Sequence, residues 1–131
     1  MSFIDAVKAY FLKCSDFRSR SSRSEYWWAI LFISLAIFPF AYVVGATIGG
    51  ILYLMGYWEY LTPVLKIFAW SYVIFLIGAL VTLSIRRLHD VDRSGWWFLL
   101  AFTIIGLIPL LVWFCTKGRD GDNRFGKNPL E

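Results

Sequence analysis

Three long stretches without a charged residue divide this chain of 131 residues. Residues 26–58, 67–85 and 95–116 contain 33, 19 and 22 residues, and none of them is Asp, Glu, Lys or Arg. A helix needs about 20 apolar residues to cross a hydrocarbon core. Because lipid offers the backbone no hydrogen-bond partner, a helix is the structure that lets one segment cross alone. The pattern predicts an all-α membrane protein with three transmembrane helices.

The composition supports lipid over water as the surrounding solvent. Hydrophobic residues make up 59% of the chain and charged residues 17%, whereas soluble domains carry about 45–50% and about 25%. A soluble domain this small could not hide so much apolar surface. The net charge of +4 is modest. Since no long basic run or basic–aromatic alternation occurs, we expect contact with anionic lipid surfaces and no nucleic-acid binding.

The charged residues set the boundaries of one membrane domain, residues 1–131. A basic segment at 1–25 precedes a first span predicted over 26–55, a second over 67–85, a third over 96–116 and a polar tail at 117–131. The first stretch is longer than one crossing requires, and it can tilt, extend beyond the membrane or bend at Pro39. Gly45 and Gly49 in this stretch have the spacing that lets helices approach closely, and we expect packing within the chain.

The segment before the first span does not resemble a secretory signal, because its charges are spread along it. Its first part alternates apolar and charged residues at helical spacing, with Phe3, Ile4, Val7, Tyr10, Phe11 and Cys14 on one side and Asp5, Lys8 and Lys13 on the other. This predicts a short amphipathic helix, either in the membrane interface or packed on the protein's own cytoplasmic surface. Ser22 and Glu25 have capping-box spacing, so we expect the next helix to begin near Arg23 to Glu25.

The distribution of Lys and Arg predicts a cytoplasmic N-terminus. The basic segment holds five, the first loop one, the second loop three and the tail four. Three spans place the eight of the basic segment and second loop inside, but leave the four of the tail outside. If 96–116 instead re-enters, broken at Gly106 and Pro109, twelve lie inside and one outside. Such a hairpin needs burial in protein, so we favour three spans and keep re-entry as the alternative.

Polar residues gather before the first predicted span, between the second and third, and in the tail. They form a candidate interface or ligand cluster of Arg20, Arg23, Glu25, Trp27, Arg86, Arg87, His89, Asp90, Arg93, Ser94, Trp96, Asn123 and Arg124. Asp90 lies four and three residues after Arg86 and Arg87 and can pair with either. Arg124 could pair with Asp90 or Glu25 in an ordered turn, with Phe125 as an apolar plug, provided that the tail lies on the same side of the membrane.

No constellation for catalysis, metal binding or a cofactor is visible. His89 is the single histidine, and no Ser or Cys lies in a nucleophile motif beside it. Cys14 and Cys115 are far apart and lack metal-site spacing. We therefore predict a protein that is not an enzyme, with no cofactor and no metal, and read Arg86, Arg87 and Asp90 first as an ion-pair cluster at a helix end.

The motifs resemble the bacterial inner-membrane family called domain of unknown function 805 over nearly the whole chain. The most specific match is Arg86-Arg87-Leu88-His89-Asp90 followed by Arg93-Ser94-Gly95-Trp96-Trp97, joined by Glu25-Tyr26-Trp27 and by Asn123-Arg124-Phe125-Gly126. Ser19 departs from the family's usual Gly, and Lys127-Asn128 from its usual Pro-Asp. The resemblance implies a small multi-spanning inner-membrane protein and no established activity.

Arginines beside tryptophan pairs favour binding over catalysis. Trp27-Trp28 and Trp96-Trp97 each follow an Arg-Ser pair, and arginine forks suit phosphate oxygens while tryptophan anchors at headgroup depth. We therefore predict a binding or scaffold module of the bacterial inner membrane that contacts lipids, in particular anionic ones, or a membrane-protein partner, with a homo-oligomer left open. A small transporter or channel subunit is the alternative, although no ionisable residue lies within the three predicted spans.

Overall fold

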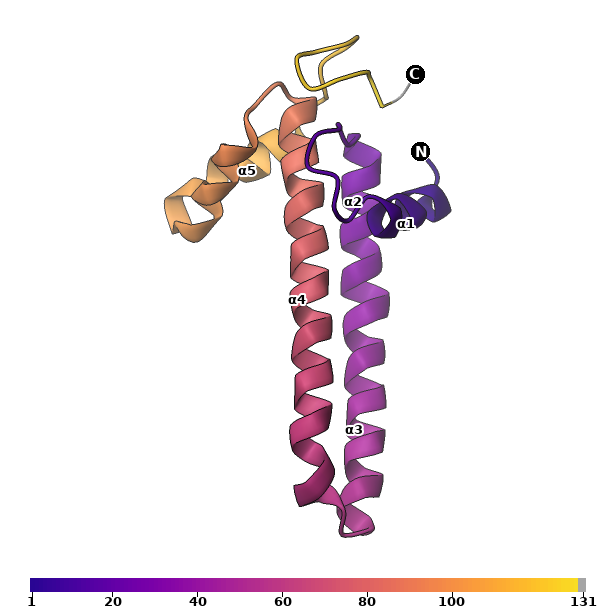
Figure 1. Ribbon diagram of the computed structural model, residues 1–131. Helices are drawn as coiled ribbons and strands as arrows, with labels where there is room; N and C mark the ends of the chain where they lie inside the picture. The colour runs from indigo at the N-terminus through magenta and orange to yellow at the C-terminus, as the bar shows by residue number, and fades with distance from the viewer. Residues whose placement is uncertain (130–131) are drawn as a thin grey trace. The chain divides into compact units, whose positions relative to one another are not determined.

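The computed structural model describes residues 1–129, apart from the side chains of Ala36, Phe38, Phe40 and Tyr60, and every regular element in that part is a helix (Figure 1). In chain order these are α1 (Phe3–Leu12), α2 (Arg23–Phe32), the π-helix η1 (Ile33–Ile37), α3 (Phe38–Leu54), α4 (Trp58–Asp90), the 3₁₀-helix η2 (Gly95–Phe102) and α5 (Ile104–Cys115). Their contacts form two units. The polar unit comprises Met1–Ala29 and the chain from Gly78 onward, and the hairpin unit comprises Ile30–Ile77.

The helical run over the predicted first span begins where its capping signal places it. The Ser22 hydroxyl accepts a hydrogen bond from the backbone N–H of Glu25 at 3.2 Å, and α2 starts at Arg23, as predicted. η1 then widens the helix directly before α3, whose first turn contains Pro39. Pro39 has no N–H to donate to the preceding turn, and a π-helix is a local departure from the α-helical hydrogen-bond pattern. The helical run from α2 to α3 continues through the proline.

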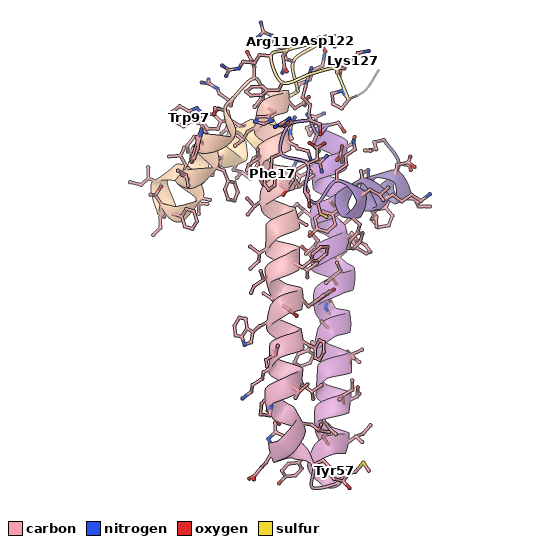
Figure 2. The ribbon with its side chains drawn as sticks, viewed as in Figure 1. Phe17, Tyr57, Trp97, Arg119, Asp122 and Lys127 are labelled. Atoms are coloured by element: carbon pink, nitrogen blue, oxygen red, sulfur yellow. The ribbon has the colours of Figure 1, made fainter. Side chains whose placement is uncertain are left out.

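The hairpin unit reverses the chain at Gly56. This residue has φ +74°, and its N–H donates to the carbonyl of Tyr53 at 3.2 Å, which closes the end of α3. The ring of Trp58 at the start of α4 lies 3.1 Å from where a side chain on Gly49 would begin, whereas Gly45 faces open space. Gly49 therefore serves packing within the chain. Figure 2 shows Tyr57 at this turn.

The helix α4 contains the predicted second span. Among the described residues, its stretch Leu61–Asp90 is the one helix that is long and apolar enough, by length and composition, to cross a membrane. The predicted second span, 67–85, lies inside it. The prediction of three transmembrane helices is not confirmed.

The third charge-free stretch is not a continuous helix. It consists of η2 and α5, separated by Thr103 in an extended conformation, and α5 has only 12 residues. At 1.5 Å per residue such a helix runs about 18 Å, short of a core about 30 Å thick. The rings of Trp97 on η2 and Trp113 on α5 meet edge to face at 5.5 Å. The stretch thus folds back on itself, with the hairpin geometry of the re-entrant alternative.

The predicted amphipathic helix forms as α1. Ala6, Ala9 and Tyr10 are buried, whereas Ile4 and Leu12 are exposed. Small alanines let α1 lie close to the protein, while bulkier apolar side chains project outward. α1 therefore packs on the protein with one face and leaves a second apolar face uncovered.

A turn at Thr103 holds the η2–α5 hairpin, and Gly106 is essential to it. The Thr103 hydroxyl accepts a hydrogen bond from the Gly106 N–H at 3.1 Å. A Cβ at Gly106 would overlap the Leu100 carbonyl and the Thr103 hydroxyl.

Overfilling a packed site costs about 1–3 kcal/mol, so Gly106→Ala should lower the midpoint of thermal unfolding in detergent. Gly78→Ala is the matched control, because Gly78 on α4 meets nothing within 4 Å. Equal midpoints for the two variants would contradict this account of the turn.

Candidate functional site

Asp90, the last residue of α4, is the centre of a buried ion cluster. Its carboxylate accepts a hydrogen bond from Arg20 Nε at 3.1 Å and pairs with Arg87 on the preceding turn of the helix. Arg20, Arg87 and Asp90 are 3%, 0% and 3% exposed. One carboxylate is therefore shared by two guanidinium groups that come from separate parts of the chain.

Arg20 also fixes the tail against the end of α4. Its two terminal nitrogens donate to the carbonyls of Gly121 and Arg119, each at 2.7 Å. The Arg119 N–H in turn donates to the Asp90 carbonyl at 2.9 Å. Gly118 lies against the Asp90 carboxylate so closely that a Cβ there would overlap it. A loop before α2 and a segment after α5 thus meet at one residue.

Arg87 binds the C-terminal end of α5, where the η2–α5 hairpin returns to α4. Its Nε donates to the Phe114 carbonyl at 3.3 Å, and a terminal nitrogen donates to the carbonyl of Thr116. The last carbonyls of a helix have no partner within it and carry partial negative charge. The buried Arg87 cation donates hydrogen bonds to these carbonyls and offsets their partial negative charge. This explains why α5 ends beside α4.

A second buried ion pair joins α4 to α2. Arg86 Nη1 lies 2.8 Å from Glu25 Oε1, and both side chains are 1% exposed. The backbone N–H of Ser21 donates to the Arg86 carbonyl at 3.1 Å. Of the two partners predicted for Asp90, it takes Arg87, because Arg86 faces Glu25 on the neighbouring helix.

The tail forms the ordered turn that was predicted, and the Phe125 ring packs on His89. The two rings are parallel within 3° at 3.9 Å, and the side chain of Asn123 donates to the His89 carbonyl at 2.8 Å. Gly126 closes the turn on Asn123 at φ +128°. The prediction that Arg124 pairs with Asp90 or Glu25 is wrong. Arg124 pairs with Asp92 at 3.3 Å, because Arg20 and Arg87 already occupy the Asp90 carboxylate.

The loop before α2 is held by Asp16. Burial alone would raise the pKa of this carboxyl, but hydrogen bonds from Ser19 and from the Arg18 backbone N–H, with the charge of Arg86, outweigh burial and lower the pKa to about 2. The Asp16 Oδ1 accepts from the N–H groups of Arg18 and Ser19 at 3.0 and 3.1 Å. This turn delivers Arg20 to the ion cluster.

The remaining predicted residues lie on the surface of the polar unit. The side chain of exposed Arg23 donates to the Cys115 carbonyl at 3.3 Å, and exposed Arg93 lies over the Trp113 ring at 5.1 Å. Trp27 and Trp96 are 39% and 80% exposed. Ser94 precedes η2 and accepts the Trp97 N–H on its carbonyl. The candidate cluster therefore separates into a buried set that builds the fold and an exposed set that can meet a ligand.

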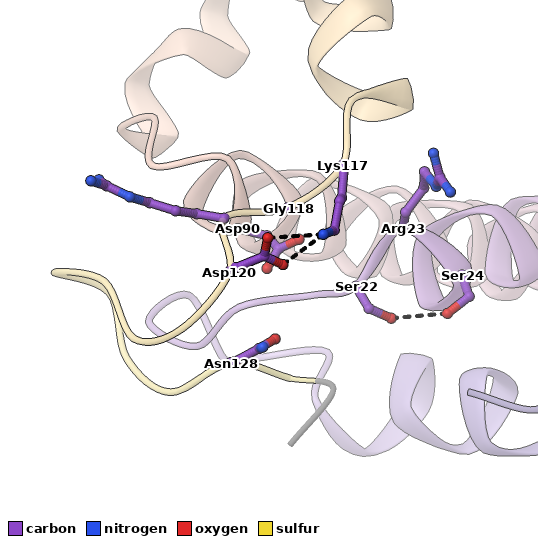
Figure 3. Close-up of a pocket in the computed structure, with 9 residues that line it drawn as sticks. Ser22, Arg23, Ser24, Asp90, Lys117, Gly118, Asp120 and Asn128 are labelled. Atoms are coloured by element: carbon purple, nitrogen blue, oxygen red, sulfur yellow. Dashed lines mark hydrogen bonds and ion pairs between the residues drawn. The ribbon is translucent and has the colours of Figure 1, made fainter.

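A polar pocket of about 230 Å³ opens beside Asp90 (Figure 3). Its walls come from the start of α2, the end of α4 and the tail: Ser22, Arg23, Ser24, Asp90, Lys117, Gly118, Arg119, Asp120 and Asn128. Of these residues, only Arg23 and Asp90 belong to the cluster predicted from the sequence. The capping signal at Ser22 marked the correct loop, and the expected docking of the tail brought it to the same region, but residue spacing did not indicate that Lys117 and Asp120 line a pocket there.

No metal site is visible in the part of the chain that the structure describes, where no three His, Cys, Asp or Glu side chains gather suitably. His89 lies beneath the Phe125 ring, and its carbonyl is bound by Asn123. The described polar residues of this unit can therefore form ion pairs within the protein and contact a ligand at the surface.

Removing the Asp90 carboxylate should be far more costly than removing an exposed one. Asp90→Asn leaves Arg20 and Arg87 buried without their counter-charge, and losing one partner of a buried pair costs about 3–5 kcal/mol. Asp120→Asn is the matched control, because the Lys117–Asp120 pair is 71% and 81% exposed, and such pairs contribute about 0–1 kcal/mol. Chemical unfolding in detergent measures both. Similar stability losses would refute the central place of Asp90.

Comparison with known proteins agrees with the membrane assignment. The chain is 39% identical over 114 residues to the inner membrane protein YhaI of Escherichia coli strain K12, covering 86% of this chain and 85% of the relative. It is 37% identical over 131 residues to the inner membrane protein YhaH of the same organism, covering 86% of each. No solved structure matches. The family model described as "Protein of unknown function (DUF805)" matches residues 14–127, a range that contains the whole ion cluster, and the chain belongs to that family.

Proposed function

We propose that this protein is a non-enzymatic binding or scaffold module whose cytoplasmic surface engages anionic lipid headgroups. The observation that carries the proposal is the set of exposed arginines beside exposed aromatic rings on the polar unit. Arg93 lies over Trp113 next to Trp97, and Arg23 is exposed at the start of α2, four residues before Trp27. Guanidinium groups suit phosphate oxygens, and indole rings anchor at headgroup depth.

The proposed topology has two spans and a re-entrant hairpin. The run from α2 to α3 and the helix α4 cross the membrane, η2 and α5 enter and return, and both chain ends are cytoplasmic. Charge supports this arrangement, because it places twelve Lys and Arg inside and one, Lys66, outside. The ion cluster supports it too, since Asp90 binds the loop before α2 and the tail together.

The helix α1 extends the same surface. Its Phe3 ring meets Trp28 of α2 edge to face at 5.6 Å, and its Ile4 and Leu12 are exposed. An uncovered apolar face next to Lys8 and Lys13 is typical of a helix that lies in the plane of the headgroups. α1 would then dock the polar unit onto the cytoplasmic leaflet.

The buried arginines are unsuited to contact lipid directly. Arg87 is 0% exposed and already engages Asp90 and the carbonyls at the end of α5. Replacing Arg87 by a neutral residue would therefore test the stability of the fold and not contact with lipid. Arg23 and Arg93, which are exposed, are the residues whose charge can be removed to test lipid contact.

Lipid retention tests the proposal. A basic residue near an anionic surface contributes about 1 kcal/mol, or roughly fivefold in affinity. Arg23→Gln with Arg93→Gln should therefore reduce the phosphatidylglycerol and cardiolipin that copurify with the protein, measured by mass spectrometry against phosphatidylethanolamine. Lys66→Gln is the control, because Lys66 lies on the opposite side in the proposed topology. A double variant that retains wild-type amounts of anionic lipid would count against the proposal.

A further inference from the structure

The polar pocket beside Asp90 has the lining of a binding site for a phosphate group. We propose that it takes a phosphate monoester, borne either by a lipid headgroup or by a small soluble molecule. The inference extends the proposed function, and in its lipid-borne form it rests on it. The pocket shares Arg23 with the exposed arginine surface, and a second cation, Lys117, comes from the tail. Arg119 also lines the pocket, but its guanidinium group pairs with Asp92 at 2.6 Å.

The charges around the pocket favour an anion even though two carboxylates line it. Asp90 is already shared by Arg20 and Arg87, so its negative charge is more than compensated. Asp120 is paired with Lys117, and both side chains are largely exposed. Exposed ion pairs contribute little, so an incoming phosphate can take Lys117 from Asp120. Figure 3 shows Lys117 reaching across to Asp120 at this pocket.

One wall of the pocket supplies neutral donors at a helix start. Ser22 caps α2 and Ser24 lies in its first turn. Their hydroxyl oxygens are hydrogen-bonded at 3.1 Å, so the pair keeps one hydroxyl proton to donate to a ligand. The N-terminus of a helix carries partial positive charge and free N–H groups. A phosphate monoester has three acceptor oxygens and two negative charges near neutral pH. The hydroxyls at the start of α2 and the cations Arg23 and Lys117 therefore match these oxygens and charges.

The pocket is large enough for a phosphate monoester, and its floor is held in place by hydrogen bonds between the tail and α4. Its volume of about 230 Å³ corresponds to roughly eight water molecules at about 30 Å³ each, which is space for a phosphate and a short polyol. The tail cannot drift from α4, because Arg20 binds the Arg119 carbonyl and the Arg119 N–H binds the Asp90 carbonyl. Lys117 and Arg119 flank Gly118, which lies on Asp90. The ion cluster thus holds the tail, and with it Lys117, beside the start of α2.

Titration of the protein in neutral detergent tests the site with four probes: glycerol 3-phosphate, inorganic phosphate, and mixed micelles containing either phosphatidic acid or phosphatidylglycerol. Charge-assisted hydrogen bonds contribute about 1.5–3 kcal/mol, so Lys117→Gln should weaken saturable binding about tenfold or more. Lys127→Gln, also on the exposed tail (Figure 2), is the matched control and should bind like the wild type. Ser24→Met fills the pocket without changing charge and should also weaken binding.

The outcomes distinguish a lipid-borne monoester from a soluble one, and the phosphate site from the proposed lipid-binding surface. Displacement of glycerol 3-phosphate by phosphatidic acid, but not by phosphatidylglycerol, identifies a lipid-borne monoester; binding of the soluble ester without such displacement identifies a soluble ligand. Absence of saturable binding for every probe, or equal binding by wild type, Lys117→Gln and Ser24→Met, overturns the site. Loss of the soluble ester in Lys117→Gln with phosphatidylglycerol retained would leave the proposed lipid surface intact.

Discussion

The burial of Arg20 and Arg87 against Asp90 is the interaction on which the rest of the polar unit depends. A charge removed from water needs a partner and further hydrogen bonds to be tolerated. Asp90 supplies the partner, and the carbonyls of Phe114, Thr116, Arg119 and Gly121 supply the hydrogen bonds. Those carbonyls lie at the end of α5 and in the tail. The chain after α4 must therefore return to the point from which it left.

This requirement also explains the short elements that follow α4. One long helix over the third apolar stretch would carry the tail away from Asp90, so η2 and α5 form a hairpin that turns at Thr103. The hairpin leaves apolar residues such as Ile104 and Ile105 89% and 81% exposed. Lipid is the solvent that tolerates such surface, and the relatives named as inner membrane proteins are consistent with it. The exposed arginines and tryptophans border this surface.

Sequence patterns predicted what depends on local chemistry. The cap at Ser22, the amphipathic α1, the second apolar stretch within α4 and the Phe125 turn all follow from spacing over a few residues. The break between η2 and α5 could not be predicted, because 22 uncharged residues satisfy the length criterion for a span and hydropathy does not reveal that Arg87 binds the α5 carbonyls. The pairing of Arg86 with Glu25 and of Arg124 with Asp92 depends on which helix faces which, information that residue spacing does not contain.

The side of the membrane on which the two chain ends lie tests the central claim most directly. If Arg20, Asp90 and the tail form one cluster, the N-terminus and the C-terminus must share a compartment. Fusions of green fluorescent protein to either end should then fluoresce, fusions of alkaline phosphatase to either end should be inactive, and alkaline phosphatase inserted at Tyr57 should be active. A C-terminal alkaline phosphatase fusion that is active while the N-terminus is cytoplasmic would contradict the account, because the tail could not reach Asp90.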